Sequence, residues 1–331
     1  MADHADGAND GDIFIYRGGR APEHVTHVRI DESVDEIEKS AFQFRRHLVQ
    51  VETHDGIRKV GNGAFSYCRS LRWINLKSAV EIGQCAFYNC EDLESVEFGG
   101  NLETIGEEAF WNCSSLTHLK LPSIITIETV AFSNCTRLID IELSERLETI
   151  EQGAFGGCER LQRIVIPLKR DLFVFEEYPL WQGKGTVKGY HQFDECEQLT
   201  TVDLVGGTHK TVASLHMDSW RTEMIAEINR INQVLPTIPA DDKTGVIQQW
   251  MEWVIDKMDN YKAEHCRYVK EGITLLELAV WKTKLDEKEE SSVERKTKKV
   301  KVDAESARKE RRITCGADIV IKNVFPFLKL N

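Results

Sequence analysis

The chain has 331 residues, of which 41% are hydrophobic and 29% are charged, the balance of an ordinary soluble globular protein of roughly two domains. This composition excludes a collagen, a mostly disordered chain and a disulfide-dense miniprotein, and no apolar run approaches the roughly 18 residues of a membrane span. The formal net charge is −12, with +1 on residues 217–331 and −13 on residues 1–216. Because an acidic surface repels phosphate backbones, nucleic-acid binding by this part of the chain is disfavoured.

Residues 1–24 are expected to form a partly flexible N-terminal segment. They begin with the acidic stretch MADHADGANDGD, which lacks the apolar region of a secretory signal. We therefore expect an intracellular location, cytoplasmic or nuclear, and cysteines that are present as free thiols.

A repeat of 22 or 23 residues organises residues 25–205. An Ala-Phe pair recurs six times, with an aliphatic residue four positions before each Ala and, in all copies but the first, a Cys four positions after it. A Leu and two apolar residues spaced by two follow, a pattern typical of a short strand with one buried face. We therefore predict an α/β repeat solenoid whose stacked coils bury a common core. The six alanines are Ala41, Ala64, Ala86, Ala109, Ala131 and Ala154.

Two partial repeats extend this pattern. Val25, Val28 and Ile30 fit the strand positions of an N-terminal coil, and residues 193–204 restore the pattern after an insertion near 167–190. The prediction is therefore six clear coils and two partial ones.

The repeat motif I-G-x-x-A-F-x-x-C-x-x-L-x-x-I-x-L closely resembles that of the BspA-type leucine-rich repeat family. The layout is also similar to that of algal members of this type with a short helical C-terminal region. The resemblance implies short parallel strands and a surface that binds other proteins. Secreted bacterial members resemble adhesins, and this alternative stays open.

The cysteine column has three interpretations. One Cys per coil differs from the paired C-x2-C spacing of zinc sites. Neighbouring strands lie about 4.8 Å apart, so disulfides between coils are geometrically conceivable. We expect instead a stack of small buried thiols.

The alternation along each strand also predicts an exposed face, which lines the concave side in leucine-rich repeats. Trp73 is the candidate anchor, because exposed indoles are frequent interface hot spots; the alternative is an indole packed along its neighbours. Acidic side chains on this face would attract a basic partner, or form a merely solvated surface. The predicted protein-binding residues are Trp73, Asn75, Glu97, His118, Lys120, Asp140, Glu142 and Arg163.

The sequence contains no phosphate-binding loop, dinucleotide-binding, zinc-protease or serine-hydrolase motif. We therefore predict no catalytic residue, no cofactor and no metal site. The leading function is a protein-binding scaffold with an unidentified protein partner. A substrate-recruiting subunit of an enzyme complex, such as a ubiquitin ligase, is a further alternative.

From Met217 onward the apolar period becomes helical. Residues 217–285 hold three amphipathic stretches, over 218–235, 241–258 and 273–285, expected to form a cap on the last coil or a small bundle. Residues 286–312 are expected to be a charged linker or helix, and residues 313–331 an apolar segment that packs on the helical region.

The charged segment contains basic clusters that resemble nuclear-import signals. The alternative is a solvated helix face with paired charges. The cluster residues are Arg295, Lys296, Lys298, Lys299, Lys301, Arg308, Lys309, Arg311 and Arg312.

Overall fold

The computed structural model describes residues 13–174, 178–179, 186–187 and 191–294. The chain divides into two compact units, one of Met1–Thr211 with Ala226–Ile255 and the other of Val212–Ile225 with Asp256–Asn331. The first unit contains a parallel-strand β-solenoid of about six turns, which confirms the predicted fold class.

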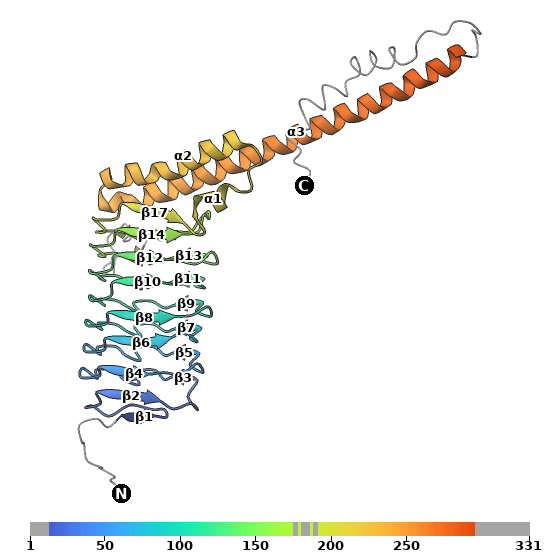
Figure 1. The fold of residues 1–331 in the computed structure, drawn as a ribbon. Helices are drawn as coiled ribbons and strands as arrows, with labels where there is room; N and C mark the ends of the chain where they lie inside the picture. Colours follow the sequence, from blue (N-terminus) through green and yellow to red (C-terminus); the bar gives the residue numbers. More distant parts are fainter. Residues whose placement is uncertain (1–12, 175–177, 180–185, 188–190, 295–331) are drawn as a thin grey trace. The chain divides into compact units, whose positions relative to one another are not determined.

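The strands predicted from the repeat form one wall of the solenoid, called here the strand face (Figure 1). β1 (Phe14–Tyr16) adds a strand that was not predicted, since it lies within residues 1–24, which were expected to be partly flexible, and pairs in parallel with β2. Neighbouring strands pair in parallel at the same repeat position, so that His118 lies opposite Asp140 and Asp140 opposite Arg163. The strands form two sheets, ordered β1-β2-β4-β6-β8 and β10-β12-β14-β17. Their bounds are Phe14–Tyr16 (β1), His27–Ile30 (β2), Gln50–Glu52 (β4), Trp73–Leu76 (β6), Ser95–Phe98 (β8), His118–Lys120 (β10), Asp140–Glu142 (β12), Arg163–Ile166 (β14) and Thr201–Leu204 (β17).

A second wall consists of two-residue strands, ordered β13-β11-β9-β7-β5-β3. Each ends in the aliphatic residue that lies four positions before the repeated Ala. The sequence indicated only a returning segment here, because two residues are too few to show alternation. The bounds are Glu36–Ile37 (β3), Lys59–Val60 (β5), Glu81–Ile82 (β7), Thr104–Ile105 (β9), Thr126–Ile127 (β11) and Thr149–Ile150 (β13).

Each Ala-Phe pair lies in a tight turn between two residues with left-handed backbone. Around Phe110 these are Glu108 (φ 56°) and Asn112 (φ 55°). Because Gly and Asn adopt this conformation most readily, they recur at the second position of the turn. The residues concerned are Asn89, Asn112, Asn134 and Gly157.

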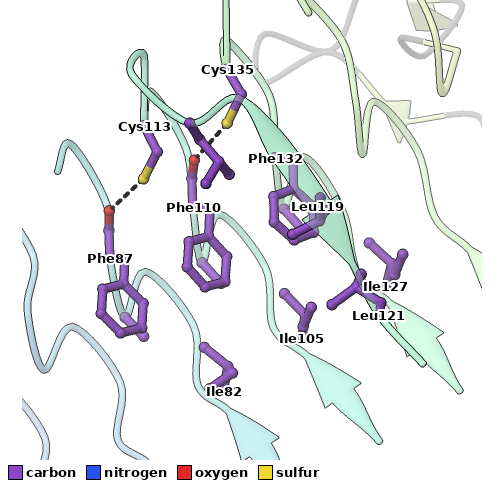
Figure 2. Packing of buried hydrophobic residues seen from close by; sticks show 14 of the residues in the cluster. Ile82, Phe87, Ile105, Phe110, Cys113, Leu119, Leu121, Ile127, Phe132 and Cys135 are labelled. Atoms are coloured by element: carbon purple, nitrogen blue, oxygen red, sulfur yellow. Dashed lines mark hydrogen bonds between the residues drawn. The ribbon is translucent and has the colours of Figure 1, made fainter. Parts of the chain in front are cut away.

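The repeated phenylalanines stack as a column through the core (Figure 2). The ring centroids of Phe87 and Phe110 are 4.9 Å apart and those of Phe110 and Phe132 are 5.0 Å apart, with interplanar angles of 6° and 3°. All three side chains are fully buried. Because each ring packs on rings from both neighbouring coils, a coil is stable only inside the stack.

The cysteine column lies beside this phenylalanine column, and each thiol donates a hydrogen bond to the phenylalanine carbonyl of the preceding coil. Cys113 Sγ lies 3.2 Å from Phe87 O, and Cys135 Sγ lies 3.3 Å from Phe110 O (Figure 2). The prediction of buried thiols is therefore confirmed. The six repeat cysteines are Cys68, Cys90, Cys113, Cys135, Cys158 and Cys196.

Thiol labelling is expected to separate these cysteines from the others. Burial raises the pKa of the Cys68 thiol to about 12 and that of Cys113 well above its usual value, so both thiolate formation and access are suppressed. In the native protein, exposed Cys266 should react with Ellman's reagent at once and the six repeat cysteines slowly. In denaturant all nine cysteines should react with the reagent. Cysteines that do not react with the reagent even after denaturation would contradict the assignment as buried free thiols.

Arg45 replaces the cysteine in the first copy of the repeat. Its Nε donates hydrogen bonds to Ala21 O (2.9 Å) and Pro22 O (3.0 Å), and a guanidinium nitrogen donates to Gln43 O (2.7 Å). Ala21 N–H bonds to Ala41 O, as the phenylalanine N–H of each regular coil bonds to the next Ala carbonyl. Ala21 therefore holds the place of the repeated phenylalanine in an irregular first coil. Arg45 donates to its carbonyl, as each repeat cysteine donates to the phenylalanine carbonyl of the preceding coil.

The regular coil continues further into the expected insertion than the sequence indicated. Phe173 is buried and forms a parallel bridge with Ile150, in the position of another short strand of the second wall. The Phe turn of this coil follows at Phe193, after a short antiparallel pair of β15 (Tyr178–Pro179) and β16 (Thr186–Val187).

The helical part of the chain consists of α1 (Gly207–Val212), α2 (Asp218–Val234) and α3 (Lys243–Glu294), with 3-10 turns at Leu235–Thr237 and Ala240–Asp242. The two apolar stretches expected at 241–258 and 273–285 belong to the single helix α3. No proline lies between them to end the helix.

Residues of α2 and α3 satisfy backbone groups of the last coil within the first unit. The buried Lys243 ammonium donates hydrogen bonds to Cys196 O (2.9 Å) and Glu197 O (2.8 Å). Further bonds run from Phe193 N–H to Thr244 Oγ1 (3.2 Å) and from Val202 N–H to Asn232 Oδ1 (2.8 Å). Such contacts are those required of a cap on the open end of a solenoid.

The second unit has its own packing between the start of α2 and the middle of α3. The rings of Trp220 and Tyr261 stack with centroids 4.8 Å apart, and Lys257 Nζ lies 3.1 Å from Glu223 Oε1.

Candidate protein-binding surface

Trp73 begins β6 and lies within the strand face. Its side chain is 38% exposed, whereas the next residue, Ile74, is fully buried. Its register neighbours are Gln50 on β4 and Ser95 on β8, both polar and exposed. The indole is therefore an apolar patch within a polar surface, as the alternation of the repeat predicted.

The parallel register brings all the predicted contact residues onto the strand face. Asn75, Asp140 and Arg163 are half-buried, and the remaining members are exposed. They lie on five strands: Trp73 and Asn75 on β6, Glu97 on β8, His118 and Lys120 on β10, Asp140 and Glu142 on β12, and Arg163 on β14.

Most charged side chains of this face form ion pairs with the neighbouring coil or strand end. The nitrogen–oxygen distances are 2.7 to 3.0 Å in the lysine and arginine pairs. Each pair is exposed and contributes at most about 1 kcal/mol. The acidic side chains therefore have local counter-charges, which weakens the attraction for a basic partner expected from the sequence. The pairs are Arg29–Glu52, Lys77–Glu97, Lys120–Glu142, His118–Asp140 and Arg163–Asp203.

One residue of the strand face is covered. The alternation along β14 places Val165 on this face, but the residue is only 7% exposed. It lies between Glu142 and Asp203 in register and lines a hollow of about 410 Å³ together with Gly206 and Gly207. The chain that follows β17 thus lies beside Val165 and closes this end of the strand face.

Three further features considered from the sequence are a metal site, a membrane span and the basic clusters. Within the described ranges, no group of three or more His, Cys, Asp or Glu side chains is placed to hold a metal ion. No described helix has both the length and the apolar character needed to cross a membrane. The nine basic cluster residues, Arg295, Lys296, Lys298, Lys299, Lys301, Arg308, Lys309, Arg311 and Arg312, lie outside the described residues.

A second exposed feature, which the sequence analysis missed, is a row of aromatic side chains at the turn after the buried phenylalanine. Phe44, Tyr67, Tyr88 and Trp111, from four successive coils, lie with ring centroids 4.9, 5.5 and 4.7 Å apart. Phe44 is 46% exposed, and the other three are half-buried. We call these four residues the aromatic row. Its signal was present in the sequence, as an aromatic residue one or two positions after the phenylalanine in four consecutive repeats.

Stacked parallel strands, a buried Ala-Phe turn and a repeat of 22 or 23 residues define a leucine-rich repeat protein. The family model described as "BspA type Leucine rich repeat region" matches residues 22–123 and 64–178, with six copies. This part of the chain therefore belongs to the BspA-type leucine-rich repeat family.

The chain is similar to solved structures of bacterial leucine-rich repeat proteins. The leucine-rich repeat protein TpLRR of T. pallidum is 29% identical, over 46% of this chain and 72% of that one, with a TM-score of 0.42. A leucine-rich repeat protein of Eubacterium ventriosum is 24% identical, over 52% of this chain and half (50%) of that one, with a TM-score of 0.41. The pneumococcal vaccine antigen PcpA is 18% identical, over 58% and 65%, with a TM-score of 0.29. No curated protein matches the chain.

Proposed function

We propose that this chain is a non-enzymatic scaffold that binds a partner protein through the strand face, with Trp73 as the anchor. The observation that carries the proposal is the exposed indole, which lies among polar neighbours on a wall of paired strands. Tryptophan is enriched among the few residues that dominate binding energy at interfaces. An intracellular location, and nuclear import through the basic clusters, stay predictions.

The ion pairs between coils also support this use of the strand face. They hold long side chains such as Lys120 and Arg163 in defined positions before a partner arrives. A surface ordered in advance loses less side-chain entropy on binding. The pairs therefore contribute to binding through preorganisation, whereas the net charge of the face contributes little.

Trp73→Ala is the test of this proposal. Truncating an anchor costs about 2 kcal/mol of binding, so the dissociation constant should rise about 30-fold. A partner would first be isolated from the native cell, and its affinity for the purified variants then measured by calorimetry. The fold should survive, because the side chain points out of the core.

Trp253→Ala is the matched control, because Trp253 is an equally exposed indole (43%) that lies on α3. It should leave the affinity unchanged. A Trp73→Ala variant that unfolds would mean that the indole packs against its neighbours. A variant that neither unfolds nor loses affinity would contradict the strand face as the binding surface.

A further inference from the structure

The aromatic row ends at Trp111, and the same corner of the solenoid is hollow beyond it. The next two coils carry Ser133-Asn134 and Gly156-Gly157 at the turn positions that hold aromatic rings in the preceding coils. These small residues line a hollow of about 280 Å³, together with Trp111, Val130, Gly153, Asp194 and Glu195.

Backbone hydrogen bonds hold the turns around the hollow in register. Asn112 N–H donates to Ser133 O (2.9 Å), Asn134 N–H to Gly156 O (2.7 Å) and Gly157 N–H to Asp194 O (2.9 Å). The hollow therefore crosses two complete coils, with Trp111 at one end and the Asp194-Glu195 turn at the other. Three coil steps of about 4.8 Å separate these ends by about 14 Å.

The two ends of the hollow differ in chemistry. The next turn carries Ser133 in place of another ring, so Trp111 has no aromatic neighbour on that side among the described residues. At the other end, Asp194 and Glu195 bring two carboxyl groups, and none of the described lining residues is basic. Asp194 Oδ1 is also buried without a hydrogen-bond partner in the described structure. Such an oxygen is costly unless a donor or a cation lies nearby.

Val130 adds an apolar side chain to the lining of the hollow. Its backbone has φ 47°, in the left-handed region that begins every Ala-Phe turn of the repeat. The five other coils hold Ser40, Gly63, Cys85, Glu108 or Gly153 at the corresponding position. Among these residues only Val130 has a large aliphatic side chain, so the lining of this hollow differs from the same corner of the other coils.

We propose that this hollow is a second docking site, which takes an extended segment of a partner protein that carries a lysine or arginine. About four residues of extended peptide, at about 3.3 Å each, span the distance from Trp111 to Asp194. An apolar residue of the peptide packs on Trp111, and the cation pairs with Asp194 and Glu195. This site lies on the turns of the coils, apart from the strand face, and so goes beyond the function proposed above.

The test uses the full-length chain and a phage-displayed library of random dodecapeptides. Selected peptides should carry a lysine or arginine about four residues from an aromatic or large aliphatic residue. They would be synthesised with a fluorescent label, and their binding measured by anisotropy. Peptides selected without a basic residue would overturn the proposal.

Ser133→Tyr is the decisive variant, because it extends the aromatic row into the hollow. Tyr88 and Trp111 occupy the same turn position in other coils, so the variant is expected to fold, with an unchanged thermal transition. Peptide binding should fall at least about tenfold, since the hollow is filled. Ser133→Ala leaves the hollow open and should bind as the original chain does. Equal binding by Ser133→Tyr and Ser133→Ala would overturn the proposal.

Two further variants test the ends of the site. Glu195→Gln should weaken binding about threefold and reduce its dependence on salt, as expected for one exposed charge pair. Trp73→Ala should leave peptide binding unchanged, because Trp73 lies on the strand face. Loss of peptide binding in Trp73→Ala, with Ser133→Tyr unaffected, would assign the peptides to the strand face and overturn the second site. Failure of the second site alone leaves the proposed scaffold function standing.

Discussion

Cys113→Arg is expected to destabilise the solenoid by more than about 4 kcal/mol, enough to unfold the coils around it at room temperature. The Cys113 side chain is fully buried, and its thiol already lies against Phe87 O. A guanidinium there would be a buried charge without a counter-charge and without room. Urea denaturation followed by circular dichroism measures the loss.

The first coil explains why arginine is accepted at one position of this column and not at the others. Arg45 donates to the carbonyls of Ala21, Pro22 and Gln43 at the end of the stack. In the interior, the corresponding carbonyls are already occupied: Tyr88 O accepts Tyr67 N–H, and Trp111 O accepts Asn89 N–H. An interior arginine therefore lacks the acceptors that Arg45 uses.

Cys113→Ala is the matched control. It removes one weak hydrogen bond and a small amount of packing, so the loss should be about 1 kcal/mol. A Cys113→Arg variant that unfolds at the same urea concentration as Cys113→Ala would show that the column has space for a charge, contrary to its complete burial.

Lys243→Met is expected to lower the free energy of unfolding by about 2–3 kcal/mol, because one buried and one partly buried carbonyl lose their donor. These are Cys196 O and Glu197 O of the last coil, and methionine keeps the apolar stem without the ammonium. Burial lowers the pKa of the Lys243 ammonium, so its hydrogen bonds must offset a desolvation cost. Hydrogen exchange should show the loss first at the amides of β17 and of the Phe193 turn.

Lys210→Met controls for the loss of a lysine charge in the same unit. Lys210 forms an exposed ion pair with Glu145, and its side chain is 63% exposed. Its replacement should cost less than about 1 kcal/mol. Equal effects of the two substitutions would mean that the Lys243 contacts do not stabilise the last coil.

The repeat in the sequence was sufficient to predict the coils, because each buried column, such as Phe110 with Cys113, demands one residue type at one spacing. The second wall escaped prediction, since its two-residue strands show no alternation. The burial of Val165 on the strand face could not be predicted, because Gly206 and Gly207, which line the hollow beside it, belong to no repeat.

The exposed features were harder to predict than the core for a physical reason. Outward residues are free of packing constraints, so the strand alternation indicates their direction but not their ion pairs with the next coil. The aromatic row becomes visible only when turns from successive coils are aligned in register. The hollow beside Trp111 depends on what is missing, namely side chains at Gly153 and Gly156, and a search for conspicuous residues passes over such positions.

The contacts at the two ends of the stack bear on how such a protein changes in evolution. Arg45 near the N-terminal end, and Lys243, Thr244 and Asn232 at the other, satisfy backbone groups that would otherwise invite pairing with a foreign chain. Interior coils need no such specialised residues, because each presents the same carbonyl, thiol and ring to its neighbours. Whole units of 22 or 23 residues can therefore be gained or lost between the ends. The strand face can thus become longer or shorter by one coil at a time, while the residues that cover the two ends of the stack must be kept.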